Sequence, residues 1–130
     1  SPIIDPIWIE VDFGEWDGLR IYEVEERYPA EYRLWLSTAS YAPPGGESYE
    51  VALARARQGM ESTVAEYPGK RIAVVTHNGI IKSAIAAAMS TQAEAIFNVD
   101  VTPCSITTIS IWPSDGLLAV RSVNERGHLR

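Results

Sequence analysis

The sequence predicts a single α/β domain in which helices cover a mostly parallel β-sheet. The main indication is residues 72–76, an uninterrupted apolar and β-branched run (IAVVT) that is typical of a strand buried on both faces. The Ile- and Ala-rich residues 80–89 predict a buried helix, and residues 49–67 carry the periodicity of an amphipathic helix. This helix–strand–helix order is typical of an α/β fold.

Bulk properties limit the class of protein. A length of 130 residues, without repeats, low-complexity tracts or a long linker, predicts one domain over residues 1–130. The net charge of −6 argues against a nucleic-acid partner, because phosphate contacts need clustered Lys and Arg. No apolar run is long enough to span a membrane. Cys104 is the single cysteine and permits no internal disulfide, so we expect a cytoplasmic protein.

The remaining elements follow from breakers, caps and alternation. Residues 19–37 have helical periodicity, but Pro29 divides them into two short helices. Ser48 is placed to cap the helix at 49–67. Residues 105–112 alternate with period two and predict a strand, which a turn at 113–116 connects to an antiparallel partner at 117–123. The predicted sheet is therefore mixed.

His77 is the strongest functional lead from the residues themselves. It lies at the end of the predicted strand 72–76 and just before the helix that follows, where open α/β sheets bind ligands. Free backbone N–H groups at a helix N-terminus favour an anion, and Asn78 and Gly79 would supply such donors. The alternative is a core histidine whose hydrogen bonds are satisfied internally.

Residues 8–18 carry four carboxylates and three aromatic side chains, and two glycines four residues apart end the stretch. Taken alone, this composition favours a solvated acidic loop that its aromatic residues hold in place.

Four segments, in order, resemble motifs of the histidine phosphatase superfamily, which has the phosphoglycerate mutase-like fold. Residues 10–18 (EVDFGEWDG) resemble its E-x-x-F-G-x-W-x-G stretch, and residues 44–48 (PGGES) resemble a loop that opens a helix. Residues 74–79 (VVTHNG) resemble its second-histidine strand, and residues 124–129 (NERGHL) a common ending. The resemblance implies a three-layer sandwich, with helices on both faces of a mixed, mostly parallel sheet, that is incomplete at the N-terminus.

The departure from the family pattern concerns the nucleophile. Family members begin with a strand that ends in Arg-His-Gly, and this sequence contains no such motif. The chain resembles the C-terminal two-thirds of such an enzyme. The strand at 72–76 would then lack a neighbour, so we expect a second chain (a homodimer), a swapped segment or an N-terminal segment to fill the gap.

The resemblance implies phosphoryl transfer through a phosphohistidine. His77 would stabilise the charge on the transferred group, assisted by the N–H groups of Asn78 and Gly79. Glu10 would be the general acid that protonates the leaving oxygen. An acid in this role must hold its proton near neutral pH, which burial among Trp8 and nearby aromatic residues, with a neighbouring phosphate, would favour.

Other assignments stay open at this point. Glu47 orders its loop, pairs with a nearby cation or contributes to substrate binding. Asp12, Glu15 and Asp17 fit a solvated loop. No cluster of metal ligands is present, and we expect no cofactor. The implied substrate is a small phosphorylated metabolite, with hydrolysis and mutase transfer both open. The alternative function is a catalytically inactive domain that binds a phosphorylated ligand or a protein partner.

Overall fold

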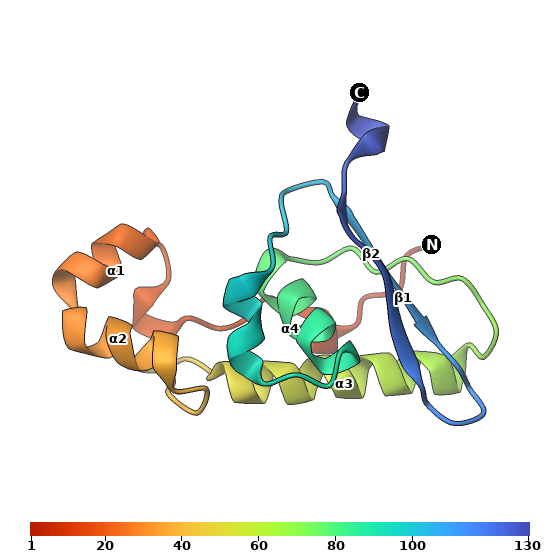
Figure 1. Ribbon diagram of the computed structural model, residues 1–130, viewed down its shortest axis with the longest axis horizontal. Helices are drawn as coiled ribbons and strands as arrows, with labels where there is room; N and C mark the ends of the chain where they lie inside the picture. The colour runs from red at the N-terminus through yellow and green to blue at the C-terminus, as the bar shows by residue number, and fades with distance from the viewer.

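The computed structural model describes all residues from 1 to 130 (Figure 1). Short 3₁₀ turns lie at Pro6–Trp8, Gly14–Trp16, Ala93–Asn98 and Gly127–Leu129. No helix combines the length and the apolar character needed to cross a bilayer. The helices are α1 (Ile21–Arg27), α2 (Pro29–Ser37), α3 (Tyr49–Glu66) and α4 (Asn78–Ala88), and the strands are β1 (Ile106–Ile111) and β2 (Leu118–Glu125).

The predicted division of the first helical stretch at Pro29 is confirmed. Pro29 opens α2, where its missing N–H costs nothing because the first N–H groups of a helix have no partner within it. Helices α1 and α2 form a lobe at one end of the molecule (Figure 1). This lobe is held by an aromatic cluster in which Trp35 contacts Trp16, Tyr49 and Phe97 with ring centroids 5.1–5.9 Å apart.

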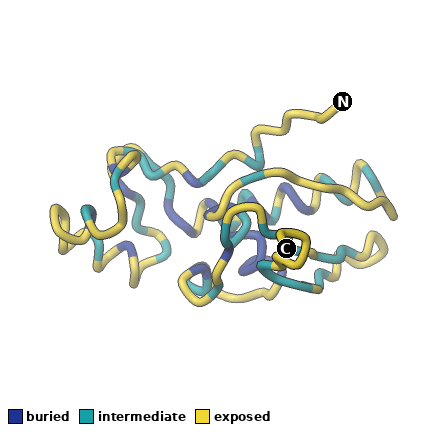
Figure 2. Tube along the Cα trace, turned by 90° about the horizontal axis from the view of Figure 1, so that it is seen from above, coloured by how far each residue is buried: buried dark blue, intermediate teal, exposed yellow.

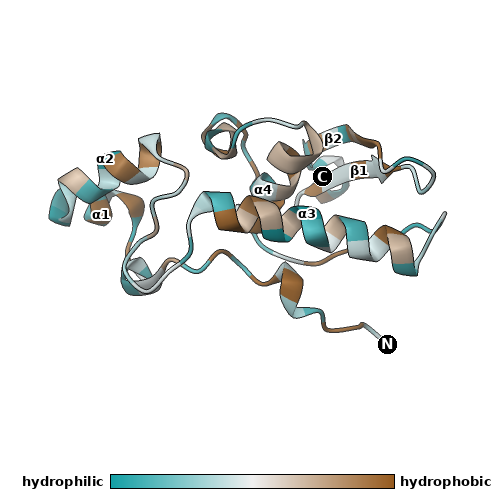
Figure 3. Cartoon of the chain, turned by 90° about the horizontal axis from the view of Figure 1, so that it is seen from below, coloured by the Kyte–Doolittle hydropathy of each residue, from teal (hydrophilic) through white to brown (hydrophobic).

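The core of the body lies between α3 and α4. The Oγ atom of Ser48 accepts a hydrogen bond from the N–H of Val51 at 3.2 Å, which confirms the predicted cap of α3. Helix α3 carries polar and apolar residues along its length (Figure 3). Its buried residues Ala56 and Met60 pack against Ile80 and other small apolar side chains of α4.

The predicted antiparallel hairpin is confirmed. Strands β1 and β2 pair with Ile109 opposite Val120 and Ile111 opposite Leu118, and the register shifts near Thr108. Both strands contact α4. The hairpin uses one edge of β1, so the other edge has no strand beside it.

The predicted strand at 72–76 is wrong in two respects. No backbone N–H or C=O of residues 71–76 forms a hydrogen bond, so this segment belongs to no sheet. It is also exposed rather than buried, with Val75 98% and Ile72 46% exposed. Figure 2 shows that long stretches of the chain trace are exposed and that the buried stretches are short. The physical reason is that a strand exists only with a partner, and residues 1–130 place none beside this run.

The predicted sheet differs from the observed one for the same reason. The only sheet is the two-stranded antiparallel pair β1–β2, so these residues do not form a mostly parallel sheet or a three-layer sandwich by themselves. Helices α3 and α4 pack against each other, and residues of both strands pack against the cluster between them.

Candidate active site

His77 is the residue immediately before α4. Its backbone is extended (φ −124°, ψ 165°), and its C=O accepts the hydrogen bond from Ile81 at 3.1 Å that starts the helix. The side chain is exposed and makes no hydrogen bond within the chain. The alternative of a satisfied core histidine does not describe this residue, because the imidazole is free to contact a ligand.

Glu10 lies on the same helix N-terminus, 67 residues earlier in the sequence. Its Oε2 atom accepts a hydrogen bond from the N–H of Gly79 at 3.1 Å, and its Oε1 atom accepts from Ile80 at 3.0 Å and from Val11 at 2.8 Å. A carboxylate is favoured here because the first N–H groups of a helix are unpaired and carry partial positive charge. The fold therefore brings Glu10 next to the residues that follow His77.

The surroundings expected for Glu10 are only partly present. Phe13 and Trp16 pack into the aromatic cluster around Trp35, and Trp8 packs against the core between α3 and α4. The carboxylate itself accepts hydrogen bonds from three backbone N–H groups, those of Val11, Gly79 and Ile80.

Asn78 and Gly79 differ in what they can offer a ligand. The side-chain amide of Asn78 donates to the C=O of Val101, but its backbone N–H has no partner. The N–H of Gly79 is already bonded to Glu10. A ligand at the start of α4 would find one free donor, at Asn78, and would compete with Glu10 for the others.

Glu47 is not beside His77. Its carboxylate forms an ion pair with Arg55, with Oε1 and Nη2 2.6 Å apart, and both side chains are 18% exposed. Oε1 also accepts from the N–H of Asp12 at 3.0 Å. The structure thus shows the loop-ordering role considered for Glu47, while a contact with substrate stays a prediction.

Sequence reasoning missed Arg55. A charged residue in the middle of an amphipathic helix is ordinary, so no local pattern distinguishes it. The available signal was Glu47 itself, a carboxylate near the start of the helix with no cation close by in sequence.

Two of the motif segments touch through their glycines. A Cβ atom on Gly46 would lie 2.5 Å from the C=O oxygen of Asp12, and one on Gly14 would lie 2.2 Å from that of Pro44. Only glycine permits this approach of the two backbones. The F-G and P-G-G segments are therefore one structural unit that supports Glu10.

A groove of about 940 Å³ opens between residues 69–78 and the free edge of β1. His77 is one of its lining residues, as are Ile72, Val74 and Val75 of the extended segment and Ile106 of β1. Glu10 is not part of this groove. The lining is mostly apolar and the backbone groups of the extended wall are unpaired.

Tyr49, at the start of α3, should make stability depend on alkaline pH. Burial raises the pKa of its phenol above the ordinary value of 10.0, and the charge of Glu10 raises it further. Above pH 10 the unfolded chain loses this proton while the folded chain keeps it, so stability falls as pH rises, by up to about 1.4 kcal/mol per pH unit. Urea unfolding at pH 8–11 should show this slope reduced in Tyr49→Phe and unchanged in the exposed Tyr22→Phe.

Gly79→Ala should change the free energy of unfolding, and the sign of this change should depend on whether Glu10 is present. A Cβ atom on Gly79 would lie 2.7 Å from Oε1 of Glu10 and 3.0 Å from Val11, so we expect a loss of about 1–3 kcal/mol in unfolding free energy. With Glu10→Ala the main clash disappears, and the same change should recover most of the roughly 1 kcal/mol by which alanine is favoured in helices. Denaturant unfolding of the four proteins checks this; equal effects in both backgrounds would contradict the contact.

The comparison with known proteins identifies the class. The sequence matches the Histidine phosphatase superfamily (branch 1) over residues 1–125, so the chain belongs to this family. It is 34% identical over 127 residues to a bifunctional protein of Mycobacterium tuberculosis, covering 98% of this chain and 35% of that protein. It is 31% identical over 70 residues to phosphoserine phosphatase 1 of Hydrogenobacter thermophilus, covering 53% of this chain and 33% of the phosphatase.

A solved structure shows the shared α/β fold. A phosphoserine phosphatase variant from Entamoeba histolytica, in complex with phosphoserine, superposes with a TM-score of 0.87 at 21% identity, covering all of this chain and 65% of the other. The chain spans about a third of the length of the Mycobacterium tuberculosis protein, and the 70 matched residues cover a third of the Hydrogenobacter phosphatase.

Proposed function

We propose that this chain is the larger, C-terminal part of a phosphomonoester hydrolase or mutase-like phosphotransferase that works through a phosphohistidine. The nucleophilic histidine would come from a segment outside this sequence. The observation that carries the proposal is that Glu10 binds the N–H groups of Gly79 and Ile80, in the first turn of the helix that His77 precedes. A phosphoryl group needs positive charge and N–H donors on one side and a proton donor beside its leaving oxygen.

The chemistry divides into two displacements. In the first, an imidazole nitrogen bonds to phosphorus as the P–O bond to the alcohol breaks, and Glu10 gives its proton to the departing oxygen. In the second, water attacks the phosphorus of the phosphohistidine, and the Glu10 carboxylate takes a proton from that water. The P–N bond breaks, which releases inorganic phosphate and restores the free imidazole and the protonated Glu10. In a mutase, a second hydroxyl of the substrate would take the place of water.

Phosphate and Glu10 would compete at α4 under this proposal. The N–H groups of Gly79 and Ile80 that hold the carboxylate are also the donors that an incoming phosphoryl group would find. A bound phosphoryl group beside Glu10 adds negative charge, which favours the protonated carboxyl that the first step needs.

The substrate proposed is a small phosphorylated metabolite. Two of the relatives are phosphoserine phosphatases, and a phosphorylated amino acid or hydroxy acid is the substrate class to test first. We propose no cofactor and no nucleic-acid partner, and a cytoplasmic location.

The test compares this chain with the longer gene product that contains the residues upstream of Ser1. The longer protein should hydrolyse 4-nitrophenyl phosphate and, after acid-free denaturation, carry an alkali-stable, acid-labile phosphoryl group; residues 1–130 alone should do neither. A longer protein that binds phosphate but shows no turnover and no phosphohistidine would instead support the inactive, ligand-binding alternative.

We also propose that an extended strand fills the groove between residues 71–76 and β1. Both walls present unpaired backbone edges, and the groove between them is mostly apolar. The Entamoeba histolytica structure is also longer than this chain, which covers 65% of it. The preferred occupant is the N-terminal segment of the same protein, and a second copy of the chain is the alternative.

Hydrogen exchange and light scattering separate these occupants. In the longer protein the amides of residues 72–76 should be protected in a monomer. Protection that appears only with a dimer would favour the second copy. Unprotected amides in a monomer would contradict strand completion.

A further inference from the structure

We infer that Arg55 is a positioning residue for Glu10: together with Glu47 it fixes the backbone on both sides of Glu10, and so aims the carboxylate at α4. This inference rests on the proposed function, in which Glu10 is the general acid. It assigns a role to a residue that does not touch the proposed substrate.

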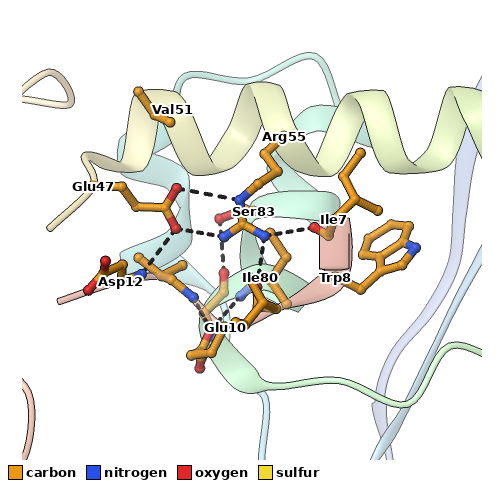
Figure 4. A network of polar contacts seen from close by, with 12 residues as sticks. Ile7, Trp8, Glu10, Asp12, Glu47, Val51, Arg55, Ile80 and Ser83 are labelled. Carbon is orange, nitrogen blue, oxygen red and sulfur yellow. Dashed lines mark hydrogen bonds and ion pairs between the residues drawn. The ribbon is translucent and has the colours of Figure 1, made fainter. Parts of the chain in front are cut away.

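The guanidinium of Arg55 joins two segments that are distant in sequence (Figure 4). Its Nη1 atom donates to the C=O groups of Ile7 at 2.7 Å and Ile9 at 2.8 Å. Its Nη2 and Nε atoms donate to the two carboxylate oxygens of Glu47 at 2.6 and 3.4 Å. One planar group therefore holds the backbone at the end of the 3₁₀ turn Pro6–Trp8 on one side and a loop carboxylate on the other.

The backbone before Glu10 is held from both sides. The C=O groups of Ile7 and Ile9 accept from Arg55. The C=O of Trp8, the last residue of the 3₁₀ turn Pro6–Trp8, instead accepts from the Oγ1 atom of Thr76, one residue before His77. The backbone of residues 7–9, just before Glu10, is thus bonded both to α3, through Arg55, and to Thr76, the residue before His77.

The backbone after Glu10 is held by the partner of Arg55. The N–H of Asp12 donates to Oε1 of Glu47 at 3.0 Å, and the N–H of Glu47 donates to the C=O of Asp12 at 2.8 Å. Glu10 therefore lies between two fixed points, at Ile9 and at Asp12, that depend on one ion pair. A displacement of about 1 Å in a catalytic group can reduce the rate about 100-fold, so this restraint has a kinetic consequence.

Leaving-group dependence distinguishes positioning from general stabilisation. A general acid matters for an alkyl phosphate, whose alkoxide is a poor leaving group, and matters little for 4-nitrophenyl phosphate. In the longer, active protein we expect Arg55→Met to lower kcat/KM for phosphoserine about 10- to 100-fold and kcat/KM for 4-nitrophenyl phosphate by less than about threefold. The ratio kcat/KM is used because it reports the first displacement, in which the leaving group departs, whereas the second displacement is common to both esters. The loss should not add to that of Glu10→Gln, since both changes remove the same interaction.

Two further variants keep the test valid if Arg55→Met fails to fold. Arg55→Lys keeps the charge but cannot donate to all four acceptors at once, and Glu47→Gln removes the ion pair while an oxygen can still accept from Asp12. Both variants should lower the ratio of kcat/KM for phosphoserine to kcat/KM for 4-nitrophenyl phosphate, as Arg55→Met does. The matched control is Arg57→Met on the same helix, because Arg57 donates to the C=O of Ala87 at the far end of α4 and should leave the ratio unchanged.

The two levels of proposal fail in different ways. If Glu10→Gln shows no leaving-group selectivity, the general-acid assignment is wrong and the role of Arg55 falls with it. If Glu10→Gln is selective but the Arg55 and Glu47 variants slow both substrates equally, or add fully to Glu10→Gln, the positioning role is overturned while the proposed function stands.

Discussion

His77→Ala is expected to lower turnover of any phosphate monoester by about 100- to 1000-fold in the longer, active protein, the loss typical of removing one donor that stabilises transition-state charge. The imidazole is exposed at the start of α4 and has no partner within the chain, so little stability should be lost with it. Steady-state kinetics with 4-nitrophenyl phosphate and with phosphoserine measure this effect. Both substrates should be slowed alike, because the charge on the phosphoryl group is common to them.

The control for His77→Ala is the other histidine. Nε2 of His128 lies 2.8 Å from the C=O oxygen of Cys104, far along the chain from α4, and His128→Ala should leave turnover nearly unchanged. A change of less than about twofold in His77→Ala would mean that His77 does not contact the phosphoryl group.

Glu10→Gln is expected to lower kcat/KM for phosphoserine by about 100-fold or more and kcat/KM for 4-nitrophenyl phosphate much less, because general acid–base catalysis contributes about 10²–10⁴-fold and only the poor leaving group needs the acid. Glutamine keeps the shape of the side chain, but its amide protons are not acidic enough to be transferred to the leaving oxygen. The measurement is the ratio of kcat/KM values for the two esters across pH 5–8, because kcat/KM reports only the first displacement.

The matched control for Glu10→Gln is Glu15→Gln, an exposed acid five residues later in the same loop. Glu15→Gln should leave kcat/KM unchanged for both esters. Equal slowing of both esters in Glu10→Gln would remove the general-acid role and leave Glu10 as a cap of α4, where it accepts from Gly79 and Ile80.

Local chemistry accounts for the elements that could be predicted from the sequence. Pro29 separates α1 from α2, Ser48 caps α3, and period-two alternation marks β1. Each of these signals acts within a few residues. The run at 72–76 also has a clear local signal, but a strand requires a neighbour, and the chain places none there. The sheet was therefore the part that local patterns could not establish.

The candidate site also has a part that the sequence could predict and a part that it could not. The position of His77 before a helix could be predicted from the strand-to-helix change, and the resemblance supplied Glu10. The N–H bonds between Glu10 and α4, and the pairing of Glu47 with Arg55, join residues that lie 8 to 70 positions apart. Such pairings depend on packing, and composition or periodicity does not indicate them.

The open edge of β1 and the unpaired residues 71–76 have a practical consequence for handling the protein. Exposed apolar strand edges pair readily with other chains, so residues 1–130 produced alone should aggregate as their concentration rises. Inclusion bodies or thioflavin-positive material would be the expected product of expressing these residues alone, and co-expression with the upstream segment should restore yield.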